Sequence, residues 1–222
     1  RDLFTKISEA SWNCGDPGLQ FDSAINEWHT CPNSGRINSS NPCSEYMFVD
    51  NSACNLASLN LMKYLTEEGS FNFEGFKHDS KLLLTAQDIL VDYASYPDEK
   101  IALNSHKFRP LGLGYANLGS LVMNLGLAYD SHESRELAAS ITALMTGTAY
   151  QQSIELAKVK GTFEEYEKNK EPFLKVMKKH SEAIRNINQT DLNKTIIRES
   201  RKVWKSVLEE GKTYGFRNAQ TT

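Results

Sequence analysis

Hydrophobic residues recur at helical spacing through the second half of the chain. Apolar side chains three or four positions apart line one face of an α-helix, because the helix turns once every 3.6 residues. The sequence therefore predicts a region of amphipathic helices, and Asp130 with Glu133 resembles a capping box at the start of one of them. These patterns occupy residues 82–93, 137–154, 173–187 and 196–208. The first apolar stripe consists of Leu82, Leu83, Ala86, Ile89, Leu90 and Tyr93.

The first half of the chain has shorter and less regular patterns. Leu3, Ile7 and Ala10 predict a helix over residues 2–13, which Gly15 and Pro17 end. Alternation of apolar and polar residues predicts short strands, and clusters of Asn, Ser, Pro and Gly predict loops. The expected segments are strands over 19–26 and 43–50, loops over 27–42 and 66–75, a helix over 55–65, and a strand or turn followed by a helix over 109–127. Together they predict an α/β fold in which helices dominate.

Length and charge narrow the class of protein. The 222 residues suffice for one large domain, and a formal charge of −3 gives no reason to expect a nucleic-acid or membrane partner. No apolar run approaches the roughly 20 residues that span a bilayer. No secretory signal is visible, so we expect a cytoplasmic protein. Because residue 1 is Arg rather than Met, we expect residues 1–222 to be a single partial domain, an excerpt or processed piece.

The four cysteines stand at positions 14, 31, 43 and 54, without a C-x-x-C pair. A structural zinc site usually takes its ligands in close pairs, so no metal site is expected. Four cysteines in a chain without an export signal are also too sparse for a disulfide framework. Free thiols in a reducing compartment are the expected state.

The segment "NPCSEY", residues 41–46, places an amide, a thiol and a carboxylate on alternate residues. Pro42 disfavours the helical region for Asn41 and favours an extended backbone there. In an extended chain, alternate side chains point to the same side. Asn41, Cys43 and Glu45 are therefore predicted to face one shared cavity, where one small molecule could meet all three.

This arrangement suits a protonated thiol better than a thiolate. A neighbouring carboxylate raises the pKa of a thiol, whereas hydrolytic cysteines use a histidine or a helix N-terminus. A cysteine hydrolase would need His29 or His106 beside Cys43. A thiol that carries a hydrogen atom fits better, with Glu45 as a general base toward a hydroxyl and Asn41 holding another. A chance match of so short a motif is the alternative interpretation.

Other candidate motifs are less informative. In "GLGYANLG", residues 112–119, the third glycine comes too late for a dinucleotide-binding fingerprint, and no Lys-Ser/Thr follows for a phosphate loop. A strand-to-helix turn with close packing is expected instead. His180 lies in an apolar stripe and is expected to be structural. Arg36 and Asn38 lead into the cysteine segment and are expected either to shape the loop or to contact a substrate.

Longer segments resemble a known family. "GRINSSNPCSEYMFVDNSACNLASLNLMKYL", "RPLGLGYANLGSLVMNLGLAYDS", "AASITALMTGTAYQQSIELA" and "YGFRNAQTT" are similar, in order, to the active-site region of the ribonucleotide reductase large chain. "CGDPGLQFDSAIN" extends the likeness toward the start of the chain. The eleven-residue step from Cys43 to Cys54 and the overall likeness point to the adenosylcobalamin-dependent class II branch. A class I reductase, which depends on a metal-radical subunit, is the alternative within the family.

The resemblance implies a ten-stranded α/β barrel with a central finger loop that carries a radical cysteine. Cys43 would become a thiyl radical and remove the 3′ hydrogen of a ribonucleotide. Glu45 would take the 3′-hydroxyl proton, and Asn41, with Ser40, would bind the substrate. Cys54 would be one of two cysteines that end each turnover as a disulfide, which a thioredoxin-like dithiol then reduces. The product would be the 2′-deoxyribonucleotide.

Two parts of the family pattern are not found in these residues. The partner of Cys54 lies upstream in the family, and Cys14 or Cys31 could replace it only within about 6 Å between Cα atoms. The phosphate-binding loop that follows "RNAQ" in the family is also missing. We therefore expect this chain to need the remainder of the reductase chain for turnover. A non-catalytic half of a split protein is the alternative from another class.

Overall fold

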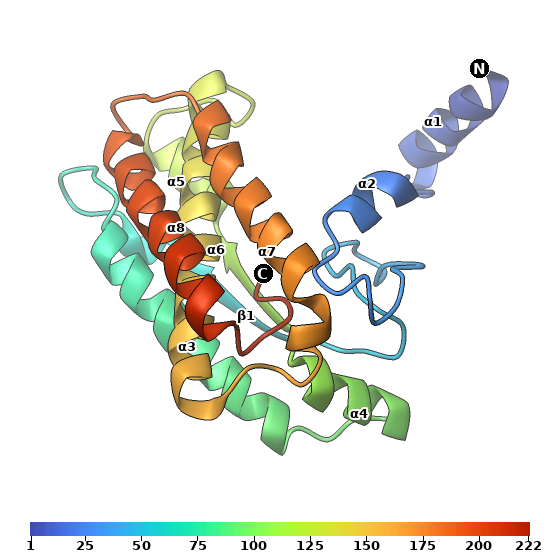
Figure 1. The fold of residues 1–222 in the computed structure, drawn as a ribbon. Helices are drawn as coiled ribbons and strands as arrows, with labels where there is room; N and C mark the ends of the chain where they lie inside the picture. The colour runs from blue at the N-terminus through green and yellow to red at the C-terminus, as the bar shows by residue number, and fades with distance from the viewer.

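Two short parallel strands lie at the centre of the computed structural model, which describes residues 1–222 (Figure 1). Strand β1 (Asn55–Asn60) pairs with β2 (Leu111–Ala116), with Asn55 opposite Leu111. The other edge of β2 meets the C-terminal segment, because the backbone N–H of Leu111 donates to the carbonyl of Gln220 at 2.9 Å. The C-terminus therefore lies beside the sheet.

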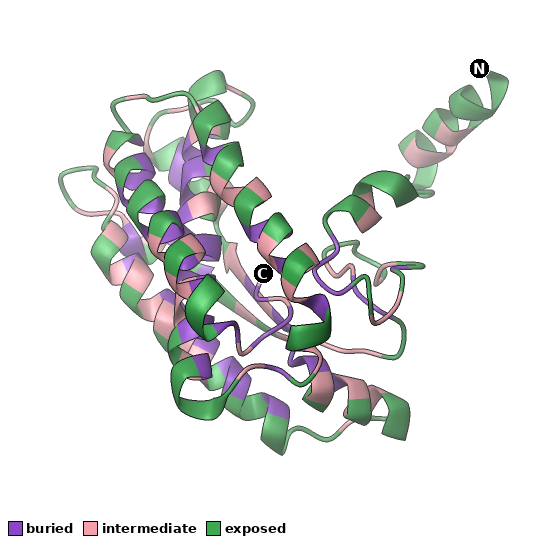
Figure 2. Ribbon diagram, in the orientation of Figure 1, coloured by how far each residue is buried: buried purple, intermediate pink, exposed green.

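Helices cover this sheet and make up most of the chain. Helix α6 lies between α3 and α8, and α7 packs against α8 (Figure 1). Figure 2 shows buried residues on the inward sides of the helices, and those of α6 run from Ser134 to Ala157 and include every position from 144 to 150. The bounds are α1 Asp2–Cys14, α2 Asp22–Glu27, α3 Phe73–Tyr93, α4 Glu99–Phe108, α5 Leu118–Asn124, α6 His132–Lys160, α7 Tyr166–Ala183 and α8 Lys194–Tyr214, with short 3-10 helices at Leu61–Tyr64 and Ile184–Asn186.

The core is aromatic where α6, α7 and α8 meet. Tyr150, Phe173, Trp204 and Phe216 are almost fully buried there and contact one another, with ring centroids 4.6 to 6.2 Å apart. Helices α6 and α8 approach so closely that a Cβ on Gly147 would lie 2.6 Å from the indole nitrogen of Trp204. Only glycine fits at that position of α6.

Helix α1 extends away from the rest of the molecule (Figure 1). The predicted helix over residues 2–13 is confirmed, and Gly15 ends it in the left-handed conformation with φ +82°. None of its residues is buried, and Trp12 is 90% exposed. The apolar face of α1 therefore has no partner within this chain.

The helix-rich α/β class is confirmed, and so are the long helices predicted in the second half. The inward side chains of α6, such as Leu137 and Ile154, are buried as predicted. The cap of that helix is displaced by one residue, because Ser131 rather than Asp130 accepts the N–H of Ser134. Two strands are present in these residues, so the ten-stranded barrel and its finger loop stay predictions.

Three short segments were predicted wrongly. Residues 19–26 hold helix α2 instead of a strand, with Asp22 in its first turn where an acidic residue is favourable. Residues 43–50 contain no strand beyond a single bridge from Ser40 to Met47. Residues 55–65 form β1 and a 3-10 helix instead of an α-helix, because pairing with β2 outweighs the local helical pattern.

The helix predicted over 82–93 is present within α3, but its apolar stripe faces outward. Leu82, Leu90 and Tyr93 are exposed, and Leu84 and Val91 are buried. The inner face of α3 also carries polar residues that bond to the sheet and to α4. The buried residues of this helix are Phe76, Ser80, Leu84, Gln87, Asp88 and Val91. None of the helices has both the length and the apolar character needed to cross a membrane.

Candidate functional site

The cysteine segment forms a tight turn. The N–H of Ser44 donates to the carbonyl of Asn41 at 3.1 Å, and the N–H of Asn41 donates to the carbonyl of Tyr46 at 3.3 Å. Ser44 adopts a positive φ of 66°. The predicted extended backbone is therefore wrong. Pro42 does restrict Asn41, but proline is also favoured at the second position of a β-turn, and here the turn prevails.

This turn separates the three side chains that were predicted to share a cavity. The side-chain oxygen of Asn41 accepts the N–H of Tyr46 at 3.0 Å, so it is engaged within the turn itself. Asn41 and Ser40 line an open hollow of about 460 Å³ with Tyr46 and neighbouring residues, and Cys43 is not part of its lining. Cys43 lies exposed in the turn. The common orientation inferred from alternation is not found.

Glu45 instead shares a cavity of about 270 Å³ with Cys54. Strands β1 and β2 form its floor, and the C-terminal residues Gln220 and Thr222 form a wall. A carboxylate and a thiol from opposite ends of the 45–54 segment therefore meet at one hollow. The other lining residues are Tyr46, Leu56, Ser58, Leu111, Gly112, Leu113 and Gly114.

The environment of Cys54 keeps its thiol protonated. Burial raises the pKa of Cys54 to about 11, and the negative charge of Glu45 contributes in the same direction. A Cβ on Gly112 would lie 3.3 Å from the sulfur of Cys54 and 2.5 Å from the Cδ2 atom of Leu56. Because Gly112 has no side chain, the backbone of β2 can lie close to the thiol of Cys54. The strand-to-helix turn predicted over residues 112–119 is confirmed, because β2 ends at Ala116 and α5 begins at Leu118. The close packing expected there is found at Gly112.

Glu45, Gln220 and Thr222 also line a second hollow of about 280 Å³ on their other side. His29 also lines this hollow, but both nitrogens of its ring already form hydrogen bonds. Its Nε2 donates to the carbonyl of Gly35 at 2.9 Å, and its Nδ1 accepts the N–H of Cys31 at 3.3 Å. Burial lowers the pKa of His29, which favours the neutral ring that these two bonds require.

His106, the other candidate base, lies on α4 against Tyr96 and 3.8 Å from a carboxylate oxygen of Asp92. Neither His106 nor His29 forms a hydrogen bond with Cys43. The geometry therefore gives no support to a cysteine hydrolase.

Side chains outside the motif hold the turn. Gln20 donates its amide N–H to the hydroxyls of Ser40 and Ser44, the latter at 3.0 Å. Arg36 pairs with Asp22 on helix α2. Asn38 donates to a carboxylate oxygen of Asp50 at 2.8 Å. Of the two roles expected for Arg36 and Asn38, these contacts support loop shaping.

No second cysteine pairs with Cys54, because all four thiols are free. Cys31 is buried, which raises its pKa to about 12. Cys14 is exposed at the end of α1, and its thiol donates to the carbonyl of Ala10 at 3.2 Å. No cluster of three or more histidine, cysteine or acidic side chains is arranged to hold a metal ion.

Of the residues that line the Cys54 cavity, sequence reasoning proposed only Glu45 and Cys54 as site residues. It treated Gly112 and Gly114 as packing positions and assigned no role to Gln220 and Thr222. The two glycines carried a signal, since alternate glycines in a strand bring a backbone close to whatever lies above it. Gln220 and Thr222 lie in the segment "YGFRNAQTT", which resembles the family, but only the fold shows that this segment lies beside β2.

Comparisons with known proteins give a consistent picture. The family model "Ribonucleotide reductase, barrel domain" matches residues 1–222. A vitamin B12-dependent ribonucleotide reductase of Rhodopirellula baltica is 55% identical over 100% of this chain and 21% of the relative. A protein of the same name from Streptomyces coelicolor is 51% identical over 99% of this chain and 23% of the relative. Another from Bradyrhizobium diazoefficiens is 43% identical over 100% of this chain and 19% of the relative. The chain thus spans about a fifth of the length of these relatives.

Proposed function

The chain belongs to the ribonucleotide reductase barrel-domain family, and from this premise we propose that it is part of a catalytic chain that reduces ribonucleotides to 2′-deoxyribonucleotides by radical chemistry. The observation that carries the proposal is the cavity that Cys54 and Glu45 line together. A protonated thiol beside a carboxylate suits the delivery of hydrogen and the removal of a hydroxyl proton. The names of the relatives favour this activity over a purely structural role.

Cys43 is the proposed hydrogen-atom carrier. Its thiol is exposed and forms no hydrogen bond within the chain, so a radical source and a substrate can both approach it. As a thiyl radical, Cys43 would take the 3′ hydrogen atom of the ribose and re-form its S–H bond. It would return a hydrogen atom to the 3′ carbon at the end of the reaction. This chemistry uses the S–H bond and needs no thiolate.

Glu45 and Cys54 would act on the substrate radical. Glu45 takes the proton of the 3′ hydroxyl, and the 2′ hydroxyl leaves as water. Cys54 and a second thiol together give two electrons and two protons, and they end as a disulfide. That second thiol would come from the remainder of the reductase chain, since Cys14 and Cys31 do not pair with Cys54 here. A thioredoxin-like dithiol would then reduce the disulfide.

Asn41 and Ser40 would bind the substrate from the neighbouring hollow. The amide of Asn41 retains its two N–H donors, because the turn uses only its carbonyl oxygen. These donors suit a ribose hydroxyl. We also propose that the ten-stranded barrel and the central finger loop form when the remainder of the chain is present.

Adenosylcobalamin is the proposed radical source, because the relatives bear the name vitamin B12-dependent reductases. The hollows beside Glu45 and Asn41 measure about 270, 280 and 460 Å³, too little to enclose a corrin with its side groups. What fits is the exposed turn, where Cys43 can face a large cofactor held mainly by other parts of the protein. When bound, that cofactor supplies the initial radical by homolysis. The same names do not favour a metal-radical subunit of class I.

The test is a pair of cysteine variants in the complete catalytic chain. Cys43→Ala is expected to abolish reduction while leaving nucleotide affinity nearly unchanged, because the thiol acts in the chemical step. Cys54→Ser should permit removal of the 3′ hydrogen but block completion and recycling by a dithiol. Cys14→Ser, at another exposed cysteine, is the matched control and should retain full activity. Turnover by the Cys43→Ala protein would refute the radical role.

A further inference from the structure

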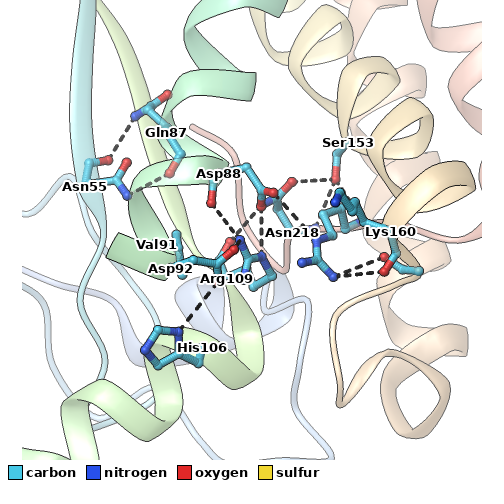
Figure 3. Close-up of polar contacts among 12 residues, drawn as sticks. Asn55, Gln87, Asp88, Val91, Asp92, His106, Arg109, Ser153, Lys160 and Asn218 are labelled. Atoms are coloured by element: carbon cyan, nitrogen blue, oxygen red, sulfur yellow. Dashed lines mark hydrogen bonds and ion pairs between the residues drawn. The ribbon is translucent and has the colours of Figure 1, made fainter. Parts of the chain in front are cut away.

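A buried ionic cluster joins helix α3, the end of α4 and the C-terminal segment (Figure 3). Arg109 follows helix α4 in the left-handed conformation with φ +51°, and only 4% of the residue is exposed. Its Nε donates to a carboxylate oxygen of Asp88 at 2.9 Å, and its Nη1 donates to Asp92 at 2.6 Å. A buried charge pair is tolerated when its remaining polar atoms are also bonded, so the other partners of Asp88 matter.

Asn218 is one of those partners and belongs to the C-terminal segment. It is fully buried, and its Nδ2 donates to Asp88 at 2.8 Å and to the carbonyl of Arg109 at 3.1 Å. Its Oδ1 accepts the hydroxyl of Ser153 at 2.9 Å (Figure 3). The Ser153 oxygen also accepts the N–H groups of Arg217 and Asn218, each at 3.0 Å. Asn218 therefore ties the C-terminal segment to α3, α4 and α6 at once.

The same segment supplies the cavity wall two and four residues later. Gln220 and Thr222 line the hollow that contains Glu45 and Cys54. Residues 219–221 form backbone hydrogen bonds with Phe108, at the end of α4, and with strand β2. The N–H of Ala219 donates to Phe108, and the carbonyls of Gln220 and Thr221 accept from Leu111 and Leu113. The buried cluster thus fixes one end of the wall.

We propose that Asn218, supported by Asp88 and Ser153, is a positioning residue that holds residues 219–222 against β2 and keeps Gln220 and Thr222 in place beside Cys54. Asn218 does not line the cavity, so it acts through Gln220 and Thr222. The effect on Cys54 follows from the structure alone. The consequence for turnover rests on the proposed reductase function.

Thiol reactivity of Cys54 tests this proposal in the complete catalytic chain. Asn218→Ala removes all three side-chain bonds, and Ser153→Ala removes the hydroxyl that holds the segment from α6. If the wall loosens, the pKa of Cys54 falls from about 11 toward its ordinary value of 9.0. Alkylation by iodoacetamide at pH 8 should then accelerate about tenfold, because a larger thiolate fraction outweighs its lower nucleophilicity. Peptide mass spectrometry resolves Cys54 from the exposed Cys43.

Asn193→Ala is the matched control. Asn193 is also fully buried, and its side chain also makes three hydrogen bonds, to Thr190, Asn188 and Glu136 at the far end of the bundle. This variant should lose comparable stability without changing the alkylation of Cys54. An equal acceleration in Asn193→Ala would show general loosening and overturn the proposal, as would unchanged alkylation in the Asn218 variant. If Asn218→Ala fails to fold, the milder Ser153→Ala decides the question by the same criterion.

Turnover separates this proposal from the proposed function. In an active reductase, Asn218→Ala should raise KM and lower kcat about tenfold or more, since a wall displaced by about 1 Å misplaces the reacting groups. If the wild-type protein shows no reduction, the proposed function fails while the alkylation result still stands. If reduction is present and the alkylation of Cys54 does not respond, only the positioning role fails.

Discussion

Replacing Gly112 with alanine is expected to impair the chemistry of Cys54 while leaving the fold intact. The new Cβ would lie 2.5 Å from Cδ2 of Leu56 and 3.3 Å from the sulfur of Cys54. Leu56 is 67% exposed, so it can rotate away into solvent. The sulfur lies in a partly buried site, so a few tenths of an ångström of movement is forced there. The added methyl group also occupies the cavity floor.

The expected magnitudes differ for stability and for activity. Overpacking a rigid core lowers the free energy of unfolding by about 1–3 kcal/mol. Replacing a glycine restricts the unfolded chain and raises the free energy of unfolding by about 0.4–1 kcal/mol. Because Leu56 is free to move, we expect the free energy of unfolding to change by about 1 kcal/mol or less. Turnover should fall about threefold to tenfold, scaled from the roughly hundredfold effect of a 1 Å misplacement.

Gly114→Ala provides the matched control on the same strand. Its Cβ would meet only the hydroxyl of Ser58 at 3.8 Å and the carbonyl of Ala57 at 3.9 Å, which are ordinary contacts. Urea denaturation measures the stability of both variants, and turnover in the complete catalytic chain measures their activity. Equal losses of turnover in the two variants would refute the reasoning, because only Gly112 lies against the sulfur. So would unfolding of the Gly112 variant by several kcal/mol.

Two further predictions concern stability. Arg109→Met should lower the free energy of unfolding, measured in urea, by about 3 kcal/mol, because the buried Asp88 loses its hydrogen-bonded cation and keeps only Arg217, whose Nε lies 3.6 Å away. Arg135→Met, which breaks an exposed pair with Asp130, should cost about 1 kcal/mol or less. Burial lowers the pKa of His180 to about 4, so between pH 6.5 and 4 the unfolded chain binds the extra proton and stability falls as the pH is lowered. The loss should be about 3 kcal/mol, and His180→Gln should remove this part of the pH dependence if the largely desolvated ring causes it.

The sequence predicted the long helices well because their pattern is local. Residues 137–154 bury Leu137, Ile141 and Ile154 through periodicity alone, and no other part of the fold is needed to explain them. Strand β1 could not be predicted in this way. Its six residues pair with β2 across more than fifty positions, and that pairing decides their conformation.

The residues of the candidate site stay a prediction from the sequence, and the geometry expected for them was wrong. Cys43, Glu45 and Cys54 were chosen from the motif and the family resemblance, and the structure brings Glu45 and Cys54 to one cavity. The alternation argument failed because a β-turn reverses the chain within four residues. A proline is compatible with both an extended residue and a turn, so Pro42 alone could not decide between them.

Helix α3 shows why polar residues can decide which face of a helix is buried. Its apolar stripe predicts that Leu82 and Tyr93 face the core, but Gln87 and Asp88 occupy that side. Gln87 donates to the carbonyl of Asn55 at 2.9 Å, and Asn55 donates to the carbonyl of Gln87 at 3.0 Å. Asp88 meets the guanidinium of Arg109. The amide N–H groups of Gln87 and Asn55 and the carboxylate of Asp88 each find a partner contributed by another element, which offsets the cost of burying them. An apolar count along one helix could not reveal these partners. Through Gln87, helix α3 is bonded to β1, and through Asp88 it is bonded to Asn218 of the C-terminal segment. These polar contacts connect α3 to two of the elements that line the cavity of Cys54.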